Sequence, residues 1–245
     1  MNRNFQPHHK KRKRILVSLI LVLGLALSGY ALFSSLISAS RELSASETGT
    51  PQLTGKKDEQ ARKSDGRHII VIDAGHGGKD PGAEGVSGKY ERAYTLSLTM
   101  KIAALLDQEP MFEPHMTRTD DTFIGLTDRA RMANELHADA FISVHGNTFP
   151  DPDIAGTESY YYADDSIRLA NTIHQQLIQA AGFKDRGVKM EGWWVLKKSE
   201  VPAILLEIGF LTNRDEEAAM LSDAHQSKVA QAIVDGLKQY FSTKK

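Results

Sequence analysis

The segment HIIVIDAGHGG, residues 68–78, decides the fold. Its first part, His68–Ile72, is apolar and β-branched and ends at Asp73, which predicts a buried strand. The second part consists almost entirely of small residues, and its glycines allow the backbone to turn sharply around His76. Ligands of open α/β sheets bind beyond the carboxyl ends of strands, so His76 is a candidate metal ligand or base. A glycine-rich phosphate loop or a plain turn is the alternative reading.

Composition limits the class of protein and the kind of metal site. The chain has 245 residues, enough for one large domain or two small ones. Its hydrophobic content of 41% is ordinary for a globular protein with a sizeable core. Cysteine is absent, which excludes disulfides and thiolate metal sites. Any metal must therefore be held by His, Asp and Glu.

Charge is distributed unevenly along the chain. Residues 1–14 contain six cations and no acid. Removing these six from the 30 Lys+Arg leaves 24 cations against 31 Asp+Glu, so the rest of the chain is mildly acidic. An acidic body argues against a phosphate-backbone partner, and we expect no nucleic acid ligand. The six cations are Arg3, Lys10, Lys11, Arg12, Lys13 and Arg14.

The basic tail precedes an apolar run at residues 15–38. About 20 apolar residues cross a bilayer as a helix, so this run predicts a transmembrane signal-anchor, with the basic tail in the cytoplasm. Removal as a signal peptide at the weak site Ser38-Ala39-Ser40 is the alternative, and would give a secreted protein. Residues 39–67 have the polar composition of a linker. We therefore expect a catalytic domain at 68–245, membrane-anchored and outside the cytoplasm.

From residue 68 onward strand patterns alternate with helix patterns, which predicts an α/β domain. We expect a single domain with a mostly parallel, mixed and twisted sheet of about six strands, flanked by helices. Pro114 places the second strand at an edge of the sheet. Asn213 with Glu216 resembles a capping box. The expected strands are 69–73, 112–117, 140–144, 157–162, 193–196 and 203–207, and the expected helices are 92–108, 126–137, 166–181, 214–221 and 225–241.

Further residues that can do chemistry follow predicted strands or begin a helix. His145 follows the strand at 140–144, Glu207 ends the strand at 203–207, and Glu91 comes just before a helix. If these strands are parallel neighbours, the side chains converge with His76 at one edge of the sheet. Two histidines and a glutamate are a known ligand set for catalytic zinc, and the second glutamate is then free to act on water. The alternative is that the histidines are structural and a glutamate pairs with Arg129 or Arg131.

Motifs over the last 178 residues resemble the zinc-dependent N-acetylmuramoyl-L-alanine amidases of bacterial cell-wall turnover, the amidase type 3 group. The motifs are IVIDAGHGGKDPGA at 70–83, ERAYTL from residue 91, MTRTDD at 116–121, LTDRARMANELHADAFISVHGN at 126–147, GTESYYY at 156–162 and VPAILLEIGFLTN at 201–213. The resemblance implies that His76, Glu91 and His145 bind one Zn²⁺. It implies that Glu207 is the catalytic acid/base.

The substrate implied by the resemblance is peptidoglycan, cut at the amide between N-acetylmuramic acid and L-alanine. Zinc would activate water and polarise the carbonyl, and Glu207 would carry the proton to the leaving nitrogen. Asp73 is a candidate for orienting His76, from its nearness in sequence. Arg129 and Asn147 are candidates for positioning substrate or bracing the loops.

Two other functions stay open at this point. One is a zinc peptidase that cuts within the stem peptide, and the other is a catalytically silent wall-binding module. The layout of anchor, linker and catalytic domain also resembles the germination-specific amidases of endospore formers, which prepare muramic-δ-lactam in the spore cortex. The sequence names no protein partner and no oligomeric state.

Overall fold

The computed structural model describes residues 66–243, which form an α/β domain. Its strands are β1 (His68–Ala74), β2 (Phe112–Met116), β3 (Ala140–Asn147), β4 (Thr157–Tyr161), β5 (Asp185–Met190) and β6 (Ala203–Phe210). Its longer helices are α3 (Glu91–Leu106), α4 (Leu126–Glu135), α5 (Ile167–Ala181) and α8 (Asp223–Ser242). Shorter helical segments are η2 (Asp164–Ser166), α6 (Trp194–Lys198) and α7 (Arg214–Met220).

The six strands form one mixed sheet in the order β2-β1-β3-β6-β4-β5. The pairs β1–β2, β1–β3, β3–β6 and β4–β5 are parallel, whereas β4 runs antiparallel to β6. The predicted fold class is confirmed, and so is the edge position of the strand that contains Pro114. Because β1, β3 and β6 are parallel neighbours, their carboxyl ends meet at the same edge of the sheet.

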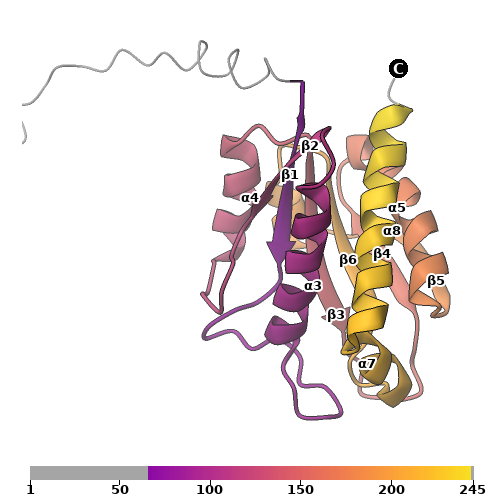
Figure 1. The fold of residues 1–245 in the computed structure, drawn as a ribbon. Helices are drawn as coiled ribbons and strands as arrows, with labels where there is room; N and C mark the ends of the chain where they lie inside the picture. The colour runs from indigo at the N-terminus through magenta and orange to yellow at the C-terminus, as the bar shows by residue number, and fades with distance from the viewer. Residues whose placement is uncertain (1–65, 244–245) are drawn as a thin grey trace, which may run out of the picture. The chain divides into compact units, whose positions relative to one another are not determined.

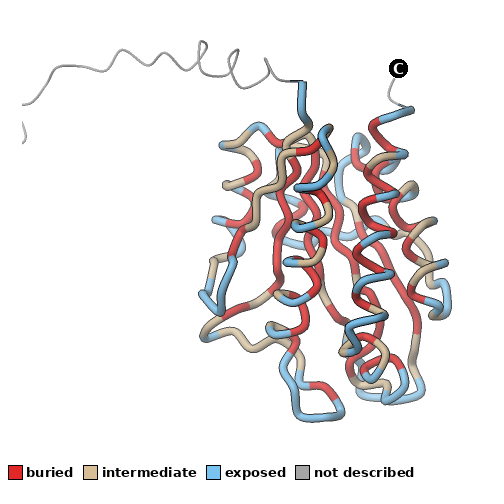
Figure 2. Tube along the Cα trace, viewed as in Figure 1, coloured by how far each residue is buried: buried red, intermediate tan, exposed pale blue. Residues whose placement is uncertain are grey.

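The two faces of the sheet are covered unequally. Helices α3, α5 and α8 lie along one face (Figure 1), where they bury the larger core, including Ile72, Val144 and Leu206. The other face is covered by α4 and α6, of ten and five residues, over a smaller core that includes Phe141 and Leu205. Figure 2 shows the strands buried along most of their length, between helices whose outer sides are exposed. The short helices leave part of the second face uncovered, and the cavity that His76 and His145 line opens there.

Two sequence predictions of secondary structure are wrong. Residues 193–196 were expected as a strand, but Trp194–Lys198 form helix α6, which buries Val195 and Leu196 against the second face. The fifth strand is instead Asp185–Met190, which pairs in parallel with β4 and has no buried residue. Its polar sequence, DRGVKM, carries no strand pattern, because an exposed edge strand is held by main-chain hydrogen bonds rather than by apolar burial.

A buried polar group fixes α5 to the sheet. His174 on α5 is 4% exposed, and its ring nitrogens contact Ser159 Oγ at 2.8 Å and Asp185 Oδ1 at 2.9 Å. Ser159 is fully buried and its hydroxyl is bonded to His174 within the protein, so this Ser-His-Asp group joins β4, β5 and α5 rather than serving as a nucleophile.

The helix at 214–220 begins as the sequence predicts, with one difference. The Asn213 side chain accepts hydrogen bonds from the backbone N–H groups of Asp215 and Glu216, which caps the helix. The Glu216 carboxylate does not complete the capping box. It accepts from the backbone N–H groups of Gly156 and Phe210 instead, and so fastens α7 to the loop before β4 and to the end of β6.

No helix within residues 66–243 has both the length and the apolar character needed to cross a membrane. The predicted anchor at 15–38 and most of the linker at 39–67 lie outside the described residues.

Candidate metal centre and active site

The alternation of side chains along each strand determines which of them reach the site. Alternate residues of a strand point to opposite faces of the sheet. Phe141 of β3 and Leu205 of β6 belong to the core under α4 and α6, so the residues two and four positions further along point to the same face. These residues include His145 and Glu207, which are also register partners on the neighbouring strands β3 and β6. The parallel register therefore sets an imidazole and a carboxylate side by side.

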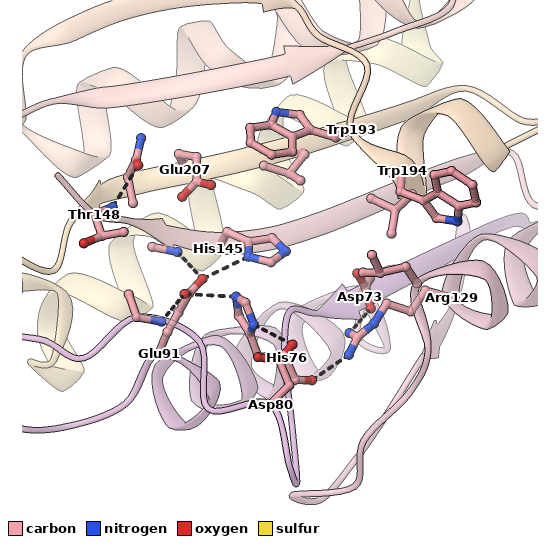
Figure 3. A pocket seen from close by; sticks show the side chains of 16 residues that line it. Asp73, His76, Asp80, Glu91, Arg129, His145, Thr148, Trp193, Trp194 and Glu207 are labelled. Carbon is pink, nitrogen blue, oxygen red and sulfur yellow. Dashed lines mark hydrogen bonds and ion pairs between the residues drawn. The ribbon is translucent and has the colours of Figure 1, made fainter.

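A cavity of about 550 Å³ opens on this face, where α4 and α6 begin. Its wall includes His76, Glu91, His145 and Glu207, which come from four separate segments of the chain (Figure 3). The cavity also receives Asp73, Arg129 and Asn147, the three residues predicted to position substrate or ligands.

The loop after β1 holds His76 in a backbone conformation with φ of 62°. A left-handed backbone is uncommon for a residue other than glycine and requires support from its surroundings. Arg129 of α4 gives that support, since its Nη2 donates to the His76 carbonyl at 2.6 Å. The neighbouring Gly75 is required for a different reason: a Cβ at this position would lie 2.3 Å from the His145 ring. The glycines of this loop thus allow the two histidines to approach.

Glu91 lies between the two histidines at the start of α3. Its Oε2 is 3.0 Å from His76 Nε2, and its Oε1 is 2.9 Å from His145 Nδ1. The carboxylate is held in place by backbone N–H groups, from Ala83 to Oε2 at 2.9 Å and from Gly146 to Oε1 at 3.0 Å. The alternative in which a glutamate of the site pairs with Arg129 or Arg131 does not hold for Glu91.

Three ligand atoms, one each from His76, Glu91 and His145, lie within 4.8 Å of one another. Among residues 66–243 this is the group of His, Asp and Glu side chains whose spacing could hold a metal ion. Its donor set, two imidazoles and a carboxylate without a thiolate, is one that catalytic zinc sites use. The other ring nitrogen of His76, Nδ1, is 2.9 Å from Asp80 Oδ2. Metal-binding histidines commonly donate to such a carboxylate, so the surroundings of His76 also fit a metal ligand.

The charges of this cluster are strongly coupled. Burial alone would raise the pKa of Glu91, but the hydrogen bonds and charges of His145 and His76 outweigh it and hold the pKa far below the usual range. Burial would lower the pKa of His76, but Glu91 and Asp80 outweigh it and raise that pKa. Without a metal, the cluster thus stabilises the cationic form of His76 and the anionic form of Glu91. A divalent cation would take the place of the proton on His76 and would be stabilised by the same negative charges, those of Glu91 and Asp80.

The surroundings of Glu207 shift its pKa in the opposite direction to that of Glu91. Burial, followed by repulsion from Glu91 and Glu158, raises its pKa well above the usual value. Its Oε2 is buried, and no group among residues 66–243 donates a hydrogen bond to it. Figure 3 shows the Glu207 carboxylate on the side of the cavity where His145 and Glu91 lie. The raised pKa strengthens this carboxyl group as a proton acceptor, and its place in the cavity lets it exchange that proton there, as a general acid or base requires.

Glu158, the register partner of Glu207 on β4, was not identified from the sequence. It is 3% exposed and accepts hydrogen bonds from Tyr160, Arg186, Lys189 at 3.0 Å and Asn147 at 3.3 Å. Burial would raise its pKa, but the hydrogen bonds from Tyr160, Arg186 and Lys189 lower it, so a carboxylate that stays charged lies beside Glu207. The even spacing of Glu158 and Tyr160 in GTESYYY was a signal that both face the same side of the sheet.

Asp73 does not contact His76 in the way we expected. It is fully buried, forms an ion pair with Arg129 at 2.7 Å, and accepts from Thr117 and Ser143. The residue that orients His76 is Asp80, four positions along the chain. A tight turn brings it back, with paired backbone hydrogen bonds between Gly77 and Asp80. The glycine pair before Lys79 was the available signal for that turn.

Arg129 and Asn147 brace the site. Arg129 donates to the carbonyls of Ala74, His76 and Ile124 as well as to Asp73, which leaves it committed to protein groups. Asn147 donates from Nδ2 to Glu158, and its carbonyl accepts from Leu211 N at 2.8 Å. Both residues hold neighbouring segments in place, while also lining the cavity.

Comparison with known proteins points to one family. A family model described as N-acetylmuramoyl-L-alanine amidase matches residues 70–239. The probable cell wall amidase LytH of Staphylococcus epidermidis is 36% identical over 176 residues, which are 71% of this chain and 58% of LytH. The match thus spans less than two thirds of that relative's length.

Solved structures agree with this comparison. The catalytic domain of CwlV, an N-acetylmuramoyl-L-alanine amidase from Bacillus (Paenibacillus) polymyxa var. colistinus, is 40% identical with a TM-score of 0.71, over 72% of this chain and 99% of that one. The CwlD amidase from Clostridioides difficile, solved with the GerS lipoprotein, is 29% identical with a TM-score of 0.69, over 73% and 100% of the two chains.

Proposed function

Since the chain belongs to the N-acetylmuramoyl-L-alanine amidase family, we propose that it hydrolyses the amide between N-acetylmuramic acid and L-alanine in peptidoglycan, with one Zn²⁺ per catalytic domain. The observation that carries the proposal is the convergence of His76, Glu91 and His145 in one cavity beside the buried carboxyl group of Glu207. The relatives named cell wall amidase and N-acetylmuramoyl-L-alanine amidase support the same reaction.

The three ligands would hold the metal without rearranging the loops. Glu91 is fixed by two backbone N–H groups, and His76 is oriented by Asp80. When bound, Zn²⁺ supplies a Lewis acid for the carbonyl oxygen and lowers the pKa of a coordinated water to about 7. Because Glu91 and His76 are already braced by other protein groups, little entropy is lost when these two ligands bind the ion.

Glu207 would carry the proton during hydrolysis. Its carboxylate accepts the proton of the attacking water, and its raised pKa lets it keep that proton until the amide nitrogen of L-alanine departs. Protonation of this nitrogen makes it a better leaving group, and the carboxylate is then regenerated. Glu158 assists by staying ionised next to Glu207, which increases the proton affinity of the latter.

A muropeptide digest tests the reaction. The purified full-length protein with Zn²⁺ should release intact stem peptides from peptidoglycan and leave peptide-free glycan, as measured by mass spectrometry. Glu207→Gln should retain zinc and lose nearly all turnover, whereas His76→Ala should lose the metal. Trimmed peptides still attached to glycan would identify the alternative zinc peptidase. Binding to wall without any cleavage, at full zinc occupancy, would identify a silent wall-binding module.

We also propose that the catalytic domain acts outside the cytoplasm, held by the apolar segment at 15–38. The support is the sequence pattern of six cations, an apolar run and a polar linker. If alkaline carbonate extracts the full-length protein from membranes, the anchor is wrong, and mass analysis of the mature N-terminus will show whether the segment is cleaved.

A role in the spore cortex is the narrower proposal on substrate. It rests on the layout of the chain. In an endospore-forming host, deletion should remove muramic-δ-lactam from the cortex. A cortex with normal muramic-δ-lactam content would assign the enzyme to the vegetative wall instead.

A further inference from the structure

The two tryptophans of the chain, Trp193 and Trp194, are adjacent and both line the active-site cavity. Their exposed fractions are 49% and 50%. Tryptophan is highly buried on average, so two neighbouring indoles that are half exposed in a catalytic cavity call for an explanation. Figure 3 shows both rings on the wall beyond Glu207, away from Glu91.

Both indoles are held by neighbouring side chains, and Lys198 Nζ lies over the Trp194 ring at 4.9 Å from its centroid. Trp193 meets the ring of Tyr160 edge-on, with centroids 5.9 Å apart, and Trp194 donates from Nε1 to Thr127 Oγ1 at 3.0 Å. The following residues of α6, Val195 and Leu196, are buried in the core between α6 and the sheet. A ligand that contacts these rings therefore loses little side-chain entropy, because the rings are already held in place.

The charges of the cavity indicate what kind of ligand would contact the rings. Its lining contains several carboxyl groups, and its single arginine or lysine, Arg129, is committed to Asp73 and to backbone carbonyls. A neutral sugar ring needs no free counter-charge in the wall, and its polarised C–H groups suit the electronegative face of an indole. The lining acids are Asp73, Asp80, Glu91 and Glu207.

We propose that Trp193 and Trp194 form a sugar-binding wall, against which the N-acetylmuramoyl ring of the glycan stacks while the attached amide reaches Glu207. This proposal rests on the function proposed above, and it says where the sugar half of that substrate binds. The lactyl group separates the sugar ring from the scissile amide by only a few bonds, so both can occupy the same 550 Å³ cavity. The wall contributes binding energy from the part of the substrate that does not react.

A fluorescence titration tests the wall without requiring turnover. The chain contains no other tryptophan, so its indole emission reports these two residues. The full-length protein with Zn²⁺ is titrated with each product of the proposed reaction: the peptide-free disaccharide of N-acetylglucosamine and N-acetylmuramic acid, and the free stem peptide. We expect the disaccharide to shift the emission in a saturable way and the peptide to leave it unchanged. A shift with the peptide alone would overturn the proposal.

A substrate comparison tests the same point through specificity. One substrate is the disaccharide peptide, and the other is the same peptide with a D-lactoyl group in place of the sugar. Trp193→Ala and Trp194→Ala should each lower the preference for the sugar-bearing substrate, measured as a ratio of kcat/KM values, by about tenfold, mainly through KM. Trp193→Phe should keep most of the preference, because it retains an aromatic face.

Phe149→Ala is the matched control. Phe149 is also 49% exposed but lines a different groove, so its loss should leave the preference unchanged. An equal fall for both substrates in the tryptophan variants would overturn the proposal. If an alanine variant fails to fold, the titration of the wild-type protein still shows whether the disaccharide or the peptide contacts the two indoles. If no amide is cleaved in the muropeptide digest but the disaccharide shifts the emission, the proposed function fails while the sugar-binding wall stands.

Discussion

Arg129→Met should strongly destabilise the domain, because it removes the buried cation that holds the loop of His76. Arg129 is 2% exposed and pairs with Asp73, which is fully buried. Its remaining donors satisfy the carbonyls of Ala74, His76 and Ile124. Methionine preserves much of the side-chain volume, so the change isolates the loss of charge and of hydrogen bonds.

The size of the effect follows from the burial of the pair. Removing one partner of a buried ion pair costs about 3–5 kcal/mol, since the other charge stays buried without compensation. Asp73 would retain the hydroxyl groups of Thr117 and Ser143, which places the loss toward the lower part of this range. For a domain of this size each kcal/mol lowers Tm by about 2–4 °C. A loss of about 3–4 kcal/mol should therefore lower Tm by about 6–16 °C.

Thermal unfolding of the full-length protein in a chelator, followed by tryptophan fluorescence, measures this fall. Trp193 and Trp194 precede or begin α6, which packs beside α4, the helix that carries Arg129. Arg131→Met is the matched control on the same helix. Arg131 pairs with Asp128 and Glu135 at the surface, where such pairs contribute little. Its Tm should stay close to that of the wild type.

Arg129→Met should also bind zinc more weakly, by about tenfold or more, because the His76 carbonyl loses its donor. Competition with a fluorescent chelator measures this affinity. Equal melting temperatures for Arg129→Met and Arg131→Met would refute the reasoning, since they would show that the buried pair contributes no more than a surface pair.

Three further predictions concern the site itself. In metal-free protein, Glu207→Gln should raise Tm at neutral pH. The raised pKa of Glu207 means that the wild type loses stability as pH rises from about 4 through the folded-state pKa. The glutamine amide does not titrate, so the variant does not lose stability in this way. Thermal melts across this range should show the difference closing toward acid pH, and a difference that widens there would contradict the assignment. Asp80→Asn should weaken zinc binding about 10–100-fold by removing the carboxylate on His76 Nδ1, as measured by chelator competition, and unchanged affinity would exclude the role of Asp80. Gly75→Ala should abolish zinc binding, because its methyl group would displace the His145 ring, and a variant with full zinc occupancy by metal analysis would show that the loop can move.

The sequence by itself determined the elements whose local pattern and tertiary environment agree. The strand at 68–74 is a buried apolar run, and the strands that end near His145 and Glu207 share that character. Because such strands belong in the middle of a parallel sheet, the sequence also predicted that the polar residues at their ends would meet. The motif resemblance pointed to the same four residues.

Only the tertiary structure decided the features that depend on partners distant in sequence. The aromatic run at 193–196 has strand propensity, yet from Trp194 onward it forms helix α6, which buries its own Val195 and Leu196 against the partly covered face of the sheet. Asp73 was assigned to His76 from sequence proximity. Its actual partner, Arg129, is 56 residues away and becomes its neighbour only when α4 packs on the sheet. Periodicity describes which face a residue occupies, but the contacts across that face are set by how the helices cover it.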